Sequence, residues 1–470
     1  MTENYERLTF LDNTFLVMEG PTNPMHIGAT LLFQPGDSLR GEDGGVDIEA
    51  VRAFIGARLQ YVPRYRQRLK WIPIERHPVW VDDEYFDLTY HVQHVASPHP
   101  GSMEQMREMS GRFLSQRLDR ARPMWEMLVI EGLEDGCFAL VTKVHHCMID
   151  GIGGVDLLKV LLAPMPTTEI GEPGEFAPRP TPAAADLLID EAVRFLQFPP
   201  EAAKKVRRAR DTRELGDLVR HRMRAMTESA RSGWFINASE TPLNRKIGPN
   251  RRIAHLTTNL DVVKAVKNGL GGTVNDVVIA AVAGAVRSFL IEDRDFDVAS
   301  LDFRAMVPVS IRDEEGVGEL GNQITMWLLD LPLEESDPAE RYRAVVATTA
   351  HRKETDQALG AAMLTQSASF TPSTVLSVAA RVAAATARPF NLTVTNVPGP
   401  QVPLHMLDAR LQRIFPMVPL WVNHGLGIAL FSYDGMLNWG FAADWDTVPD
   451  LDVFVTRMEA ALDELHDAAT

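Results

Sequence analysis

A stretch rich in proline, glycine, threonine and glutamate, between about Pro164 and Pro182, divides this chain of 470 residues into two parts. Such a composition is typical of a linker or a long surface segment, because proline and glycine interrupt helices and strands. Strand-like and helix-like patterns alternate on both sides of it, which predicts two α/β units. A chain of this length is too long for one ordinary core and allows two domains of about 200 residues each.

The first part contains a hairpin that ends on two histidines. Two apolar runs, residues 125–133 and 137–146, are separated by Glu134-Asp135-Gly136, which is a turn signal. Earlier in the chain, a strand is predicted over residues 27–34 and helices over 48–60 and 106–118. The second strand of the hairpin ends on His145, so HHCMIDG (residues 145–151) is predicted to be a loop at a strand end. Catalytic groups often lie on such loops, because the strand holds them in place.

The part that follows Arg252 has its own strands and helices. The patterns predict a buried helix over 274–290, strands over 303–311 and 391–398, a hairpin of 427–435 with 436–444, and a terminal helix over 451–469. We therefore predict a first domain at residues 1–165, a linker with a basic helix at 166–250, and a second domain at 251–470.

Charge and cysteine content exclude several classes of protein. The formal charge is −16 and the isoelectric point is near 5.3, which disfavours nucleic-acid binding. Two cysteines, Cys137 and Cys147, are no disulfide framework and indicate a reducing compartment. The start of the chain does not have the pattern of a secretion signal, and the longest apolar stretch, Val277 to Val286, is shorter than the ~20 residues of a membrane span. We expect a cytoplasmic protein; peripheral attachment to the inner membrane or to lipid bodies stays open.

One basic segment contrasts with the acidic background. Residues 204–226 contain nine Lys or Arg and three Asp or Glu, and they are predicted to form a helix. Its basic face is either a solvated surface or a contact for anionic lipid or for phosphates. Arg64, Arg66 and Arg68 are further candidates for phosphate contacts. The sequence predicts no oligomeric state.

The residues of HHCMIDG suit acid–base chemistry. A neutral imidazole has an ordinary pKa near 6.5, so it can take a proton from a hydroxyl group. Asp150 could orient the ring of His146, or it could fix the loop by pairing with an arginine, and Gly151 permits a sharp turn. A metal site is disfavoured, because adjacent histidines point in different directions. A plain structural loop is the simpler alternative. A serine hydrolase is disfavoured because no G-x-S-x-G occurs, and Cys147 is interpreted as a packing residue.

With these motifs the chain resembles the bacterial wax ester synthase/diacylglycerol acyltransferase family, within the chloramphenicol-acetyltransferase-like superfamily. The resemblance covers nearly the whole chain. The matching segments are LDNTFLVMEGPTNPMHIGATLLF with Glu19, Pro24, Met25 and His26, RLDRARPMWE with Pro123-Met124-Trp125, HHCMIDG, TVNDVVIAA with Asn275-Asp276, MVPVSIR, TNVPGP from Thr395, and FSYDGMLNWGFAAD. HHxxxDG alone is shared with peptide-synthetase condensation domains, so the later motifs narrow the choice.

The resemblance implies a fold and a mechanism. The fold is α/β, with two chloramphenicol-acetyltransferase-like domains of mixed sheets, joined by a linker, and an active-site tunnel at their interface. The implied general base is His146, which deprotonates the acceptor hydroxyl in a ternary complex without an acyl-enzyme. His145 contributes beside it, and Asp150 and Gly151 shape the loop. The implied substrates are acyl-CoA and a lipid alcohol, either diacylglycerol or a long-chain alcohol. No bound cofactor and no metal are expected.

The other motifs offer residues around the substrate. Asn275 is the candidate for the oxyanion neighbourhood, with Asp276 beside it, although the same pair also fits an N-cap followed by an acidic first turn. Pro123 and Trp125 are interpreted as core packing more than substrate contact.

Thr395 and Asn396 begin a loop that could line the channel. Two rival functions stay open. One is a condensation-type acyltransferase whose acyl donor is bound to a carrier protein. The other is a non-catalytic lipid-droplet or membrane-binding protein that has kept the fold.

Overall fold

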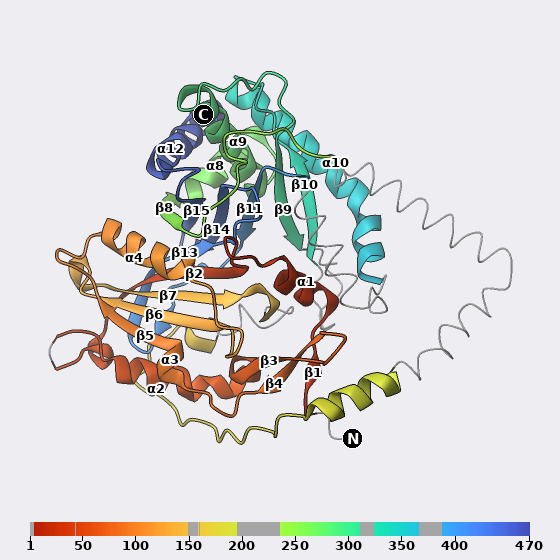
Figure 1. The fold of residues 1–470 in the computed structure, drawn as a ribbon. Helices are drawn as coiled ribbons and strands as arrows, with labels where there is room; N and C mark the ends of the chain where they lie inside the picture. Colours follow the sequence, from red (N-terminus) through yellow and green to blue (C-terminus); the bar gives the residue numbers. More distant parts are fainter. Residues whose placement is uncertain are drawn as a thin grey trace, which may run out of the picture.

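The computed structural model of the chain describes residues 4–42, 44–148, 158, 160–194, 236–310, 324–365 and 388–470. Within these ranges the chain forms two six-stranded sheets and one three-stranded sheet. In Figure 1 the sheet built mostly from the first half of the chain lies below the sheet of the second half, and the helices of the second half cover the upper one. Both large sheets contain parallel and antiparallel pairs, as the sequence predicts.

The sheet that carries the two histidines has the strand order β12-β13-β2-β7-β6-β5. Its strands are β12 (His405–Met406), β13 (Ala409–Met417), β2 (His26–Gln34), β7 (Phe138–His145), β6 (Trp125–Glu131) and β5 (Val92–Ala96). The predicted hairpin is confirmed as β6 and β7, which pair antiparallel on either side of Glu134–Gly136. Nearly every residue of these two strands is buried, which explains their continuous apolar runs.

One edge of this sheet comes from far along the chain. β13 pairs antiparallel with β2, so that Phe415 lies opposite Thr30 and Ile414 opposite Leu31. The domain limits stay a prediction. The sheet that begins in residues 1–165 nevertheless takes its edge strands from residues 405–417.

The second large sheet has the order β10-β9-β11-β14-β15-β8. Its strands are β10 (Ile324–Asp330), β9 (Arg304–Ser310), β11 (Leu392–Val397), β14 (Leu426–Tyr433), β15 (Met436–Asp444) and β8 (Arg251–Asn259). β11 runs parallel to both of its neighbours, and the other pairs are antiparallel. Asp434 and Gly435 connect β14 to β15 with φ angles of 47° and 76°, as the Asp-Gly hairpin signal predicts.

Four helices belong to this second half: α8 (Leu260–Leu270), α9 (Val274–Glu292), α10 (Pro338–Thr365) and α12 (Leu451–Ala469). α9 packs against α8, α10 and α12 and forms the centre of the largest hydrophobic cluster. Among the described residues it is the one helix whose length and composition would suit a membrane span, and 72% of its apolar window is buried inside the protein.

The first half contributes α1 (Phe10–Met18), α2 (Ile48–Arg58), α3 (Leu88–His91) and α4 (Met103–Ser115). α4 begins three residues before the predicted start, because Ser102 and Gln105 form a capping box. α4 lies against β8 of the other sheet (Figure 1). There the backbone N–H of Arg251 donates to Ser115 Oγ at 2.8 Å, which connects the two halves.

The sequence interpretation missed the small sheet, which has the order β1 (Glu6–Arg7), β4 (Pro78–Asp82) and β3 (Gln67–Trp71). The proline-rich segment is docked on this sheet and on α2. Its Arg179 donates to Asp82 at 2.9 Å, and Lys70 of β3 donates to the Pro182 carbonyl at 2.6 Å. Residues 184–194 are helical, and Leu187 is buried in the cluster formed with the small sheet. The predicted basic helix at 204–226 lies outside the described residues.

Candidate active site

His145 is the last residue of β7, and its ring is almost completely buried. Its backbone N–H donates to the Met124 carbonyl at 2.9 Å. The ring nitrogen Nδ1 accepts a hydrogen bond from the backbone N–H of Cys147 at 3.2 Å. Burial lowers the pKa of His145 well below its ordinary value, and the positive charge of Arg120 acts in the same direction. The ring is therefore neutral at pH 7, and the lone pair of Nδ1 is already engaged.

His146 begins the short 3₁₀ turn η5 (His146–Met148). Its backbone N–H donates to the Met25 carbonyl at 2.8 Å. Its ring is stacked on Phe15 of α1, with centroids 3.6 Å apart and an interplanar angle of 13°. Burial lowers the pKa of His146 to about 4, opposed by the interaction of the ring with the backbone of the same residue. This imidazole too is neutral at pH 7.

A buried carboxylate lies beside the pair. Glu19 directly follows α1, and its side chain is 1% exposed. Its Oε2 accepts hydrogen bonds from Arg117 Nη2 at 3.2 Å and from Arg120 Nη2 at 2.6 Å. Its Oε1 lies 3.7 Å from His145 Nε2 and accepts a long hydrogen bond, 3.4 Å, from the backbone N–H of Met25. One carboxylate thus contacts three of the sequence motifs.

Trp125 is the first residue of β6, Pro123 lies two residues before it, and both are buried. The indole N–H of Trp125 donates to the Tyr65 carbonyl at 2.8 Å. Its ring is stacked on His91, with centroids 4.6 Å apart. A buried tryptophan whose N–H is bonded and whose ring is stacked is well suited to packing.

The Asn275-Asp276 pair lies in the first turn of α9. The N-cap of this helix is Thr273, two residues before the sequence interpretation placed it, and Asp276 completes a capping box with Thr273. The other oxygen of Asp276 accepts from Thr349 Oγ1 at 2.6 Å. Asn275 is partly buried. Asp276 therefore holds the start of the helix, whereas no hydrogen bond joins the side chain of Asn275 to another of the described residues.

Thr395 and Asn396 lie in the second half of β11 and not in a loop as predicted, because the strand continues to Val397, and both are partly exposed. Between described residues, no hydrogen bond or ring contact joins them, or Asn275, to His146. Next to His146 the two halves of the chain contact each other through aromatic rings: Phe15 of the first half lies against Trp421 of the second, with ring centroids 6.3 Å apart. Asp150 and Gly151 lie outside the described residues.

Glu19 and Phe15 have no role in the sequence interpretation. The signal was present, since Glu19 stands in the N-terminal motif and Arg117 and Arg120 stand in RLDRARPMWE. Their contact could not be inferred, because about 100 residues separate the two motifs in the sequence.

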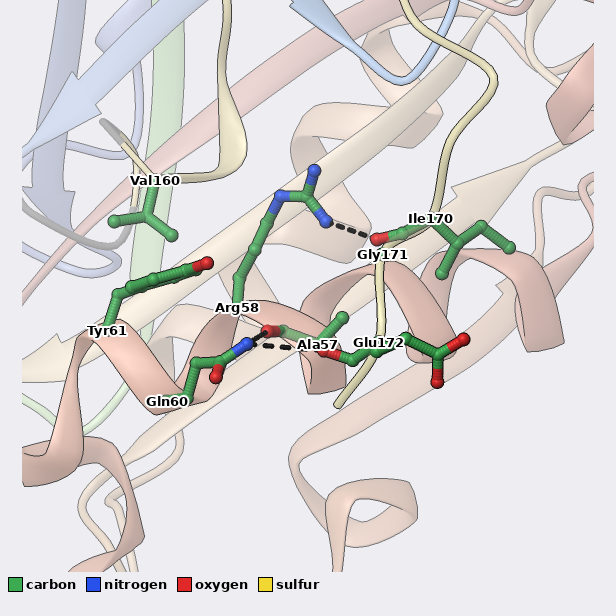
Figure 2. Close-up of a pocket in the computed structure, with 8 residues that line it drawn as sticks. All are labelled: Ala57, Arg58, Gln60, Tyr61, Val160, Ile170, Gly171 and Glu172. Carbon is green, nitrogen blue, oxygen red and sulfur yellow. Dashed lines mark hydrogen bonds between the residues drawn. The ribbon is translucent and has the colours of Figure 1, made fainter. Parts of the chain in front are cut away.

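A pocket of about 360 Å³ lies away from these residues, between α2 and the docked proline-rich segment. Figure 2 shows Arg58 reaching across it to the Ile170 carbonyl, at 2.7 Å. Gln60 bridges the carbonyl groups of Ala57 and Glu172 in the same way. Among the described residues, none of the proposed catalytic ones lines this pocket, and its hydrogen bonds attach the segment to the helix.

The basic residues near this region are paired within the protein. Arg64 contacts Glu6 at 2.7 Å, and Arg68 lies 3.5 Å from Asp83. Arg66 is buried, and its guanidinium lies over the ring of Phe176. These contacts make the three arginines poorly available for the phosphates of a cofactor.

The fold is that of the chloramphenicol-acetyltransferase-like acyltransferases. It is similar to the first condensation domain of the calcium-dependent antibiotic synthetase, with a TM-score of 0.56, 15% identity, and coverage of 100% of this chain and 97% of that one. Trichothecene 15-O-acetyltransferase from Fusarium sporotrichioides has a TM-score of 0.63 at 10% identity and covers 98% and 95% of the two chains. At these identities the likeness concerns the fold alone.

The sequence comparisons define a narrower group than the fold does. The wax ester synthase/diacylglycerol acyltransferase catalytic domain matches residues 8–278, and the C-terminal domain of the same family matches residues 320–466. A putative diacylglycerol O-acyltransferase of Mycobacterium tuberculosis is 35% identical, over 99% of this chain and 91% of its own. The wax ester synthase/diacylglycerol acyltransferase from Marinobacter aquaeolei VT8 has a TM-score of 0.68 at 26% identity, over 98% of this chain and 99% of that one. The chain belongs to the wax ester synthase/diacylglycerol acyltransferase family and is an acyltransferase.

Proposed function

We propose that the protein moves a long-chain acyl group from acyl-CoA to a lipid hydroxyl, with His146 as the general base. The acceptor is diacylglycerol, a fatty alcohol or both, and the product is triacylglycerol or a wax ester. The thioester carbonyl is attacked within a ternary complex, coenzyme A leaves as the thiol, and no acyl-enzyme forms. Acyl-CoA is a substrate, and no bound cofactor or metal takes part.

The observation that carries this proposal is the protonation state of the buried His146 ring. The ring is neutral at pH 7 because burial lowers its pKa to about 4. A neutral imidazole holds one proton and one lone pair, and Nδ1 of His146 is buried without a hydrogen-bonding partner within the described ranges. We place the lone pair on Nε2, where it can accept the proton of an alcohol. His145 cannot take this role, because its Nδ1 accepts from Cys147.

The remaining site residues complete the proposal. Asp150 and Gly151 shape the loop that follows η5. Asn275 supplies a donor near the oxyanion of the tetrahedral intermediate, helped by the positive end of α9. Thr395 and Asn396 line the acceptor side of a tunnel between the halves. Support for this placement comes from the family to which the chain belongs and from the partial exposure of the last three residues.

The site of action is proposed to be the cytoplasm, at the inner membrane or at lipid bodies, because the acceptor is a lipid. Co-sedimentation with anionic vesicles tests this. Neutralising the basic residues of the segment 204–226 should weaken binding if that segment makes the contact.

The activity is tested with purified protein, palmitoyl-CoA and either diolein or hexadecanol. We expect free thiol and ester to appear together. His146→Ala should lower turnover by about 10²- to 10⁴-fold, the usual contribution of a general base. The matched control is His255→Ala, since His255 is equally buried and is stacked on Phe415 with centroids 4.0 Å apart. That variant should lose stability but keep turnover.

Three results would contradict the proposal. Turnover from an acylated carrier protein but not from palmitoyl-CoA would identify a condensation-type enzyme. Wild-type activity in His146→Ala would show that His146 is not the general base. A protein that binds vesicles but turns over neither donor would be the non-catalytic alternative.

A further inference from the structure

The two structural restraints on His146 both lead to Glu19. The backbone of His146 is held by the Met25 carbonyl, and the backbone N–H of Met25 donates to Glu19 Oε1. The ring of His146 is stacked on Phe15, and the Phe15 carbonyl accepts from the backbone N–H of Glu19 at 3.0 Å. Both restraints thus run through Glu19, one through its carboxylate and the other through its backbone N–H.

Glu19 also faces the other histidine. Because Nδ1 of His145 accepts from Cys147, the proton of the neutral ring is on Nε2. That nitrogen is buried and has no hydrogen-bonding partner within the described ranges. The polar atom in front of it is Glu19 Oε1, at 3.7 Å, which is too long for an ordinary hydrogen bond but close enough for electrostatic attraction.

The negative charge of Glu19 is balanced by Arg117 and Arg120. Arg120 donates two hydrogen bonds to Oε2, at 3.0 and 2.6 Å, and a third to the Leu16 carbonyl of α1 at 2.8 Å. Removal of the carboxylate would leave the two cations beside His145 without their anion. Breaking an ion pair on one side only is costly when the pair is buried. The structure therefore requires a charged group at this position and not merely one of the right shape.

We propose that Glu19 is a positioning residue of the active site, which holds His146 in place through Met25 and Phe15 and balances the two arginines beside His145. This rests on the proposed role of His146 as the base. Placement of a catalytic group matters because a shift of about 1 Å can lower a rate by about 10²-fold.

The test is Glu19→Gln, which keeps the shape and removes the charge. Turnover should fall by about 10- to 100-fold while KM for palmitoyl-CoA changes less than about threefold, since Glu19 acts on the base and not on the donor. The matched control is Glu191→Gln. Glu191 is also a buried carboxylate paired with two arginines, Arg7 and Arg194, but it lies against the small sheet. The control should lower the thermal midpoint and keep turnover.

A second readout separates charge from folding. The charged or titratable groups around the histidines are Asp12 of α1, Glu19 directly after it, His26 of β2, Lys143 of β7, Cys147, Arg64, and Arg117 and Arg120 of the segment before β6. Loss of the anion leaves the two cations beside His145 unbalanced, and these cations lower the pKa of that ring, so Glu19→Gln should move the acid limb of turnover to lower pH. Arg117→Gln removes one of the cations that lower the pKa of His145 and should move the acid limb to higher pH, by up to about one unit. Rates are taken in the first seconds after dilution from pH 7, before unfolding.

If Glu19 had a purely structural role, the acid limb of turnover would not shift in opposite directions in Glu19→Gln and Arg117→Gln. Equal turnover in the Glu19 and Glu191 variants, with an unmoved acid limb, would overturn the proposal. If Glu19→Gln fails to fold, the test relies on Arg117→Gln, because Arg117 is half-exposed. An unmoved acid limb of turnover in that variant would overturn the proposal, and a shift to higher pH would support it. His146→Ala is run in parallel. If that variant is active, the proposed function fails; if it is inactive while Glu19→Gln is fully active, only the positioning role fails.

Discussion

At the scale of single residues, the two adjacent histidines differ in what their ring nitrogens face. His145 is the last residue of β7 and is buried, and its Nδ1 accepts a hydrogen bond from the backbone N–H of Cys147. His146 has left the strand, and its ring lies on Phe15. Successive residues at a strand end point to opposite sides, so identical side chains meet different surroundings. One of them is suited to be a base, and the other is a structural neighbour.

Cys147 offers a prediction at the same scale. Burial raises the pKa of its thiol well above the ordinary value, so no thiolate is present at pH 7. Cys147→Ala should therefore keep turnover within about threefold, because the change removes only a small buried group. Turnover before and after iodoacetamide treatment checks this in the wild type. A loss of 100-fold in a folded Cys147→Ala protein would point to a nucleophilic thiol and against the ternary complex.

At the scale of elements, the start of α9 shows how one motif can serve two purposes. Asp276 holds the helix by accepting from Thr273 at its N-terminus and from Thr349 of α10. The neighbouring Asn275 has no part in this cap. A helix N-terminus carries a partial positive charge, so a donor placed there is well suited to an oxyanion.

Substitution of Asp276 should accordingly affect stability, and substitution of Asn275 should affect catalysis. Asp276→Ala removes a cap and leaves Thr349 without its acceptor, which should cost about 1–3 kcal/mol of unfolding free energy. Asn275→Ala should cost less than about 0.5 kcal/mol and lower turnover instead. Urea unfolding and the palmitoyl-CoA assay measure the two effects. An Asp276→Ala protein as stable as wild type would contradict the capping role.

At the scale of the whole molecule, the two halves are built into each other. β13 belongs to the sheet of the first half and leads directly to β14 of the second, and α4 of the first half lies against β8. Arg251 adds a hydrogen bond to the Thr22 carbonyl, between α1 and β2. Buried titratable groups in both halves therefore contribute to one common stability.

This leads to a prediction about acid. Burial lowers the pKa of His26 and His255 to about 3 and that of His91, His146 and His424 to about 4. The unfolded chain takes up these protons near pH 6.5, so it binds more protons than the folded chain below that pH, and stability must fall. Each histidine costs up to about 2 kcal/mol at pH 5.

The denaturation midpoint in urea should thus decrease steadily from pH 7 to pH 5 at constant ionic strength, and the decrease should end only below about pH 3, where the folded protein is protonated as well. A midpoint that stays constant over the first interval would mean that these rings are solvated, contrary to the structure.

The sequence by itself determined the local structure and the family. The hairpins around Glu134–Gly136 and Asp434-Gly435, the buried α9 and the terminal α12 follow from apolar periodicity and turn residues, which act over a few positions. The ordered motifs identified the family in the same way, because residue types at fixed spacing are visible without a fold.

Only the tertiary structure decided which distant segments meet. The pairing of β13 with β2 and the docking of the proline-rich segment on α2 join residues far apart in the chain. The contact of Glu19 with Arg117 and Arg120, beside His145, is of the same kind. Such contacts depend on sheet register and on the burial of charge, and these are properties of the packed chain that no local pattern contains.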